Sequence, residues 1–141
     1  MAKIKTKFDS LVKLKKLKVD EKERELTKLN NQLSIVYDEL QTIKKEIENF
    51  EYPKEGNFAL ITQFKMMQNA IFNQLKEKEE FINFLEQQKQ NLQFQLKELN
   101  LEYEKMKYLQ GEEIKKYVKK LKEKEAKEMD EIALMLYKDK G

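Results

Sequence analysis

Apolar residues recur along the first third of the chain at alternating steps of three and four positions. One set repeats every seven residues and is never polar, and a second set stands three positions after it. The first set is Val12, Val19, Leu26, Leu33, Leu40 and Ile47, and the second is Leu29, Val36, Ile43 and Phe50, with Phe8 in the same register. Lys15 and Lys22 interrupt the second set. This heptad repeat predicts a long helix over about residues 4–51 that pairs with another helix along a narrow apolar seam.

The same spacing returns in the second half of the chain and predicts another helix over about residues 58–138. Its apolar seam positions are Phe64, Ile71, Leu75, Ile82, Leu85, Leu92, Leu96, Leu99, Tyr103 and Met106, and the seam is interrupted at Gln68, Lys78 and Lys89. Asn57 is the expected N-cap, because its side-chain oxygen can accept a hydrogen bond from a first-turn amide. Past Met106 the apolar phase slips by one position, and Gly111 lies at the slip, which predicts a bend or a change of partner near residue 111.

The helix-breaking residues lie between the two periodic stretches. Pro53 and Gly56 are the only proline and the only glycine in the first 110 residues, and a glycine before Asn57 tolerates a positive φ. We therefore predict a turn at 52–57 and an all-α fold. Residues 1–141 form one domain, a long antiparallel two-helix coiled coil whose C-terminal helix overhangs. If the arms fold back about residues 54 and 55, residue i faces roughly residue 109 minus i.

Composition argues against an enzyme. Of 141 residues, 39% are charged, and there is no cysteine or histidine, so thiolate ligands, the usual zinc ligand and the usual catalytic base are all missing. Nucleotide-binding loops need glycines that this chain lacks. The sequence predicts no catalytic residues, no cofactor and no metal.

Localisation and nucleic-acid binding follow from charge and hydropathy. No apolar run suits a signal peptide or a membrane span, which predicts a cytosolic protein. The net charge is only +3. The stretch 115–122 interleaves lysines with Tyr117, yet its lysines lie around the helix, glutamates flank it, and Arg24 is the only arginine. We therefore expect no nucleic-acid partner.

Several apolar side chains lie off the predicted seam, where a two-helix hairpin cannot bury them. Leu11, Leu14 and Leu17 form either a docking surface or ordinary exposed positions. Residues 129–137 favour a partner-binding helix over a self-association contact or an amphipathic end without a partner. An outer strip indicates an oligomer, a third covering helix or a recognition surface; it consists of Phe72, Phe81, Phe84, Phe94, Leu101 and Tyr108. A scaffolding coiled coil that self-associates is therefore the alternative function, and a nucleic-acid-binding rod is a weaker alternative.

Three stretches resemble the FliJ family, the small coiled-coil component of the bacterial flagellar type III export apparatus. The first is Phe8-Asp9-Ser10-Leu11-Val12-Lys13-Leu14-Lys15. The second is Ala59-Leu60-Ile61-Thr62-Gln63-Phe64 leading into Asn69-Ala70-Ile71-Phe72-Asn73-Gln74. The third is Lys124-Glu125-Ala126-Lys127-Glu128-Met129-Asp130-Glu131-Ile132-Ala133, which is similar to the C-terminal E-x-K-x-x-D-E-hydrophobic-A ending of the family. The resemblance covers nearly the whole chain.

The resemblance implies a non-enzymatic stalk, similar to the central stalk of rotary ATPases, whose terminal end enters the hexameric flagellar export ATPase. It also implies contact with the export gate protein FlhA and with export chaperones, at the cytoplasmic face of the gate. The implied ring-contact residues are Phe8, Leu11, Leu14, Leu17, Ile132, Met135 and Leu136. The implied gate-contact residues are Ile47, Phe50, Phe64, Met67, Ile71 and Phe72, of which periodicity leaves only Met67 and Phe72 outside the seam. Such a stalk is expected to be a monomer when alone.

Overall fold

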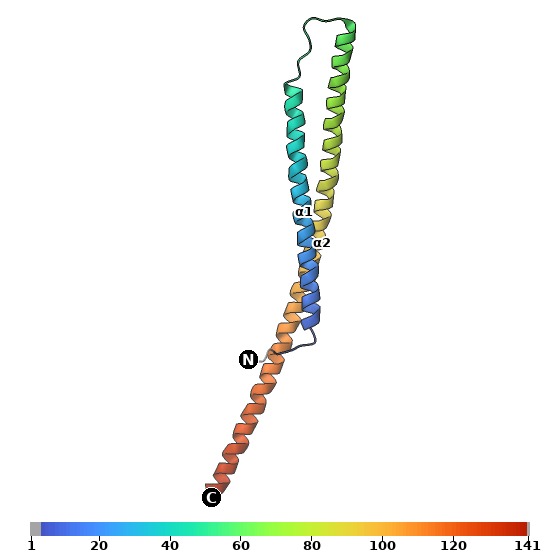
Figure 1. Ribbon diagram of the computed structural model, residues 1–141. Coiled ribbons are helices and arrows are strands. Elements are labelled where there is room, and N and C mark those ends of the chain that lie inside the picture. Colours follow the sequence, from blue (N-terminus) through green and yellow to red (C-terminus); the bar gives the residue numbers. More distant parts are fainter. Residues whose placement is uncertain (1–3, 141) are drawn as a thin grey trace. The chain divides into compact units, whose positions relative to one another are not determined.

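The computed structural model describes residues 4–140 and consists of two α-helices joined by one connection (Figure 1). Helix α1 spans Asp9–Glu48 and helix α2 spans Phe58–Lys140. The described residues contain no strand, so the predicted all-α class is confirmed and a helical hairpin is consistent with the element order. The chain divides into a terminal unit, Met1–Asp20 with Glu98–Gly141, and a central unit, Glu21–Lys97.

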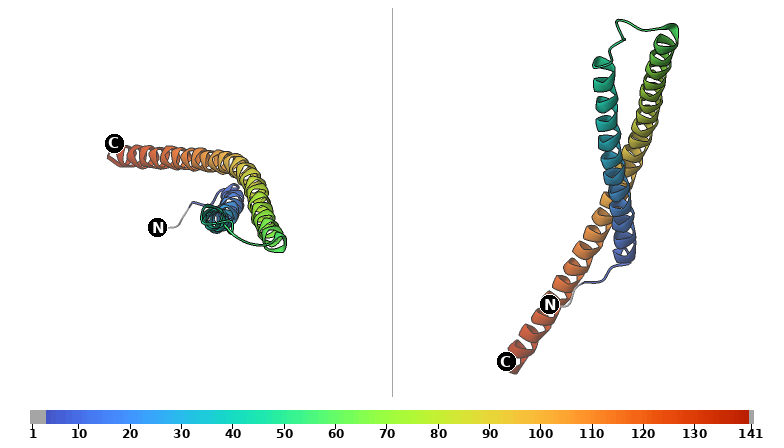
Figure 2. Two further views of the ribbon diagram at one scale, coloured as in Figure 1. Left: turned by 90° about the horizontal axis from the view of Figure 1, so that it is seen from above. Right: turned by 45° about the horizontal axis from the view of Figure 1, so that its top comes forward.

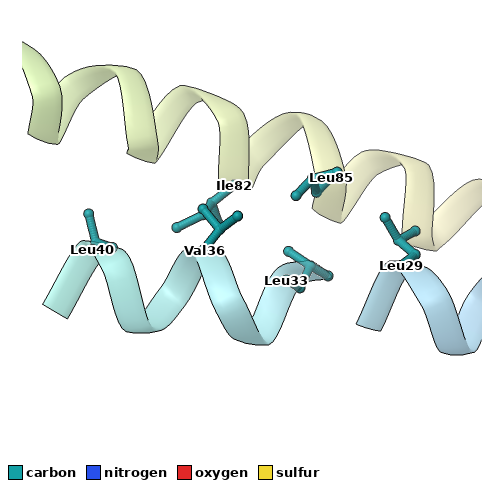
Figure 3. Close-up of a cluster of buried hydrophobic side chains, with 6 residues drawn as sticks. All are labelled: Leu29, Leu33, Val36, Leu40, Ile82 and Leu85. Atoms are coloured by element: carbon teal, nitrogen blue, oxygen red, sulfur yellow. The ribbon is translucent and has the colours of Figure 1, made fainter. Parts of the chain in front are cut away.

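The core of the central unit is a single row of aliphatic side chains shared by α1 and α2 (Figure 3). It comprises Leu29, Leu33, Val36, Leu40, Ile82 and Leu85, with Leu75 and Leu92 packed against it. All of these residues are predicted seam positions. Burying this row removes most of its apolar surface from water, which is the main force that holds two amphipathic helices together.

Polar residues at seam positions of the central unit are half-buried as well. Lys22, Gln68, Lys78 and Lys89 are each partly covered, and Lys78 forms an ion pair with Glu39 across the two helices. A lysine can lie at such a position because its methylene stem packs on the seam while its ammonium group reaches water. The heptad pattern therefore identifies the buried stripe even where the sequence interrupts it.

The partners across the two helices differ from the predicted register. In the terminal unit Lys15 pairs with Glu102, and in the central unit Tyr37 bonds to Glu86, so partner numbers add to 117 and 123. The predicted register, in which the numbers of facing residues add to 109, was therefore wrong. The connection is longer than a tight turn. Its non-helical residues advance about 3.3 Å each, whereas helical residues advance about 1.5 Å each. The connection can therefore extend past the end of α1, and α2 begins well before the residues that face that end.

The connection, residues 49–57, packs against the first turns of α2. The ring of Phe50 meets that of Phe64 with 6.0 Å between centroids, and the Tyr52 hydroxyl donates to Gln68. Figures 1 and 2 show this segment as an extended trace from the end of α1 to the start of α2. These contacts explain why α1 ends at Glu48, before the predicted boundary near residue 51.

Helix α2 begins as predicted. The Leu60 amide donates to the Asn57 side-chain oxygen at 2.9 Å, so Asn57 is the N-cap and satisfies a first-turn donor. Gly56 lacks the positive φ that the sequence suggested, since no described residue has one. Instead, a Cβ on Gly56 would lie 2.7 Å from Leu60 Cδ2, so a larger residue there would require the end of the Leu60 side chain to move.

Helix α1 begins at Asp9, after the predicted start near residue 4, because a capping box precedes it. The Phe8 amide donates to Thr6 Oγ1 at 3.1 Å, and the Thr6 amide donates to Asp9 Oδ2 at 3.1 Å. Reciprocal bonds of this kind satisfy orphan donors at a helix start and fix where it begins. The T-x-x-D spacing was present in the sequence and was overlooked.

In the terminal unit, α2 continues through Gly111 as an unbroken helix. Residues 109–114 are all half-buried, although a simple heptad seam would cover only about two positions in seven. From residue 121 to residue 139 every side chain is exposed. The phase slip near Gly111 therefore coincides with a widened covered stretch of α2, and Val118 is the last half-buried residue before the exposed stretch.

Candidate interaction surfaces

The N-terminal leucines of the terminal unit are exposed. Leu11, Leu14 and Leu17 keep 41%, 46% and 62% of their surface in water, whereas Phe8 is half-buried. The leucines are exposed because they lie off the heptad seam, whereas the neighbouring Val12 and Val19 lie on the seam and turn inward. The three leucines form an apolar surface on α1 with lysines between them.

The C-terminal part of α2 carries a second apolar surface. Ile132, Met135 and Leu136 are all more than half exposed. Other large exposed side chains in this stretch are Met129, Leu134 and Tyr137. A run of apolar residues on a helix with no covering neighbour is typical of a segment that binds another protein.

The residues implied as gate contacts separate into two groups in the central unit. Ile47, Phe50, Phe64 and Ile71 are half-buried in the seam or under the connection. Met67 and Phe72 are exposed at 49% and 45%. Periodicity predicted this separation, and it leaves Met67 and Phe72 as the members that a partner can reach without opening the hairpin.

Sequence reasoning missed an apolar group near the connection of the central unit. Phe58 is 85% exposed, and Tyr52, Ile61 and Met66 are exposed as well. Met67 lies beside them in the chain, and methionine side chains adapt readily to different partner surfaces. The signal that could have found this group is the cluster of off-seam apolar residues in the first turns of α2.

The outer strip is exposed along its whole length, as predicted. Its six members keep between 38% and 67% of their surface in water; the lowest value belongs to Phe81 and the highest to Tyr108. No third helix covers them within the described part of the chain. A covering helix from the same chain is thereby excluded for these residues, and self-association or recognition remains.

Ionic contacts between α1 and α2 accompany the seam. In the terminal unit, Lys15 Nζ lies 2.7 Å from Glu102 Oε2, and this hydrogen bond and charge hold the pKa of Glu102 below its ordinary value. In the central unit, the Tyr37 hydroxyl donates to Glu86 Oε1 at 2.9 Å, which raises the pKa of Tyr37. Both pairs are largely exposed, so each contributes little to stability.

The terminal unit also contains a pocket that the sequence did not predict. Its volume is about 210 Å³, and it is lined by the segment 4–7 on one side and by Glu113, Lys116, Tyr117 and Lys120 of α2 on the other. The sequence placed these lysines around one helix without a partner. The structure instead brings a second lysine-bearing segment beside them.

Neither a metal site nor a membrane-spanning helix is found among the described residues. These residues hold no group of acidic side chains that could bind a metal ion. None of the helices described is long and apolar enough to cross a bilayer.

Comparison with known proteins identifies the family. A family model described as Flagellar FliJ protein matches residues 4–141, which confirms the resemblance seen in the three sequence stretches. No curated protein and no solved structure matches the chain. Because the family match extends over nearly all of the 141 residues, the chain belongs to the flagellar FliJ protein family.

Proposed function

We propose that this protein is the stalk of the flagellar export ATPase ring and an adaptor that connects the ring to the export gate protein FlhA and to export chaperones. As a member of its family, it is a component of the flagellar export apparatus, and the family is non-catalytic. In this proposal the protein acts at the cytoplasmic face of the gate. Its role is mechanical and adhesive, without a chemical step.

The hairpin is proposed to be an antiparallel coiled coil with an overhanging C-terminal helix. Support comes from the seam, in which predicted heptad positions of both helices are buried or half-buried. Support also comes from cross-helix pairs such as Lys15 with Glu102, whose numbers fall in α2 as they rise in α1. A supercoiled pair of helices is stiffer than one helix, as a stalk requires.

The ring-binding end is proposed to be the terminal unit. The single observation that carries this assignment is that residues 121–139 are helical and exposed at every position while they contain large apolar side chains. Ile132, Met135 and Leu136 would pack against the inner surface of the ring. The leucines of α1 are proposed to contribute on the same unit, with Phe8 supporting them from its half-buried position.

The gate-binding surface is proposed to be in the central unit, where Met67 and Phe72 offer exposed apolar contacts. Ile47, Phe50, Phe64 and Ile71 would support this surface indirectly, since they are half-buried and Phe50 packs on Phe64. Their substitution should therefore affect stability as well as gate binding. Export chaperones are proposed to share the exposed apolar surfaces of this unit.

The test is the ATP hydrolysis rate and the oligomeric state of the source organism's flagellar export ATPase, measured with and without an equimolar amount of this protein. We expect the protein to promote ring formation and hydrolysis. The double variant Met135→Gln/Leu136→Gln should bind the ATPase about tenfold more weakly, because central apolar anchors dominate such interfaces. The control is Phe84→Gln/Phe94→Gln, two residues of similar exposure in the central unit, which should leave ATPase binding unchanged.

Two outcomes would contradict the stalk. If the protein neither binds the ATPase nor changes its assembly, the ring assignment is wrong. If sedimentation shows a stable oligomer at micromolar concentration that the Phe84→Gln/Phe94→Gln variant dissolves, the self-associating scaffold is the better function. That alternative is favoured by one observation, the exposure of all six members of the outer strip.

A further inference from the structure

The N-terminal segment and α2 together form a positively charged pocket in the terminal unit. Figure 1 and the right view of Figure 2 show the chain ahead of α1 turning towards α2. Four lysines line the pocket, Lys5 and Lys7 from the segment and Lys116 and Lys120 from α2, and Glu113 is its one acidic residue. The eight residues of the lining therefore have a formal net charge of +3.

The lysine ammonium groups of this pocket are available to a ligand. Among the ion pairs of the described residues, none includes Lys5, Lys116 or Lys120. Lys7 lies over the ring of Phe8, 5.3 Å from its centroid. The four lysines of the lining outnumber its one carboxylate and repel one another, and an anionic ligand would relieve that repulsion.

Hydrogen bonds hold the segment in position beside α2. Asp9 Oδ1 accepts from Thr6 Oγ1 at 2.6 Å and from Gln110 Nε2 at 2.9 Å. The first bond fixes the segment to the start of α1, and the second joins that start to α2. Because these bonds are made within the chain itself and tie the segment to both helices, less conformational entropy is lost when a ligand enters.

The lining combines charge with apolar surface. Ile4 contributes an aliphatic side chain and Tyr117 an aromatic ring with a hydroxyl. A volume of about 210 Å³ accommodates one or two side chains, not a nucleic-acid strand. The α2 surface that continues from the pocket alternates lysines with glutamates, which disfavours a phosphate backbone.

We propose that this pocket binds an acidic peptide segment of a partner protein, with glutamate or aspartate carboxylates placed among Lys5, Lys7, Lys116 and Lys120. The aliphatic part of the acidic side chains would pack on Ile4 and Tyr117. This inference does not depend on the stalk proposal, since it rests on the lining of the pocket alone. It assigns an acidic ligand to the lysine-lined pocket, which is separate from the exposed apolar surfaces proposed to bind the ring and the gate.

The probe is a fluorescein-labelled octapeptide of glutamates, titrated with the full chain at low salt and followed by fluorescence anisotropy. The octapeptide of glutamines is the uncharged comparison and should not bind. Lys116→Gln/Lys120→Gln should weaken glutamate-peptide binding about fivefold, as expected for two partly exposed charge contacts. The matched control Lys119→Gln/Lys122→Gln removes the same charge from the same helix outside the lining, and should change binding by less than about twofold.

Glu113→Gln provides a test that a loss of folding cannot imitate. Removing the carboxylate that competes for the lysines should tighten binding of the glutamate peptide about two- to threefold. Equal losses for the two lysine pairs, or no binding by the wild type, would overturn the proposal. Tighter binding of a single-stranded oligonucleotide of equal charge, weakened by Lys116→Gln/Lys120→Gln, would also overturn it and make nucleic acid the ligand.

Discussion

At the scale of single residues, burial in this protein depends on heptad position more than on residue type. Leu85 is 2% exposed and Leu101 is 63% exposed, although both are leucines of α2. Lysines at seam positions are half-buried, and phenylalanines off the seam are not. Hydropathy alone therefore predicts the wrong order of burial for these residues, because a hairpin of two helices has only one narrow stripe from which water is excluded.

Leu85→Ala should lower the free energy of unfolding by about 2–4 kcal/mol, since it removes a fully buried side chain and leaves a cavity in the core row. Urea denaturation followed by circular dichroism measures this change. Leu101→Ala is the control, and its effect should stay within about 0.5 kcal/mol. Similar losses for both variants would mean that Leu101 is covered in solution, for example by a second copy of the chain.

At the scale of elements, the ends of the helices were less predictable than the seam between them. Heptads located the seam of α1 and α2, and Asn57 located the start of α2, because a side-chain cap is a local signal. The ends of α1 depended on other contacts: the capping box of Thr6 with Asp9, and the packing of the connection on Phe64. The length of the connection then changed the register of the whole hairpin.

The cap of α1 should make stability depend on pH through Asp9. The hydrogen bonds from Gln110 and then from Thr6 hold the pKa of Asp9 below its ordinary value of 3.8. A carboxyl whose pKa is lower in the folded state contributes stability above 3.8, and this contribution is lost as the pH falls through the folded pKa. Asp9→Asn should therefore unfold more easily than the wild type at about pH 6, with the difference closing towards about pH 2.

Urea midpoints measured across this pH range test the prediction. Asp130→Asn serves as the control, because Asp130 lies in the exposed stretch of α2, and its curve should run parallel to that of the wild type. An Asp9→Asn curve that also runs parallel would show that the bonds to Gln110 and Thr6 do not contribute to folding.

At the scale of the whole molecule, the sequence was sufficient for the fold class and for the exposure of the candidate surfaces. Two long periodic stretches with few turn residues leave little choice of architecture. The pocket beside Tyr117 was not predictable, because the residues that complete it are more than 100 positions apart in the chain. Their meeting depends on the register, and the predicted register was wrong.

Removing residues 121–141 should leave the rest of the protein intact. The side chains of 121–139 are all exposed, so the hairpin loses no core contact. Thermal unfolding of the truncated chain should occur within about 2 °C of the wild-type midpoint, while helical ellipticity falls in proportion to the residues removed. A large drop in the midpoint would indicate that this stretch packs on the protein or on a second copy.

The exposure of α2 beyond residue 120 has a thermodynamic consequence for any partner that captures it. A helix of this length without covering contacts is only marginally stable, because local terms alone maintain it. A partner would therefore have to order the fraying residues of α2 beyond residue 120, in addition to burying Met135 and Leu136. Calorimetric titration over a range of temperatures should therefore give a heat-capacity change more negative than the contact area of a rigid helix accounts for.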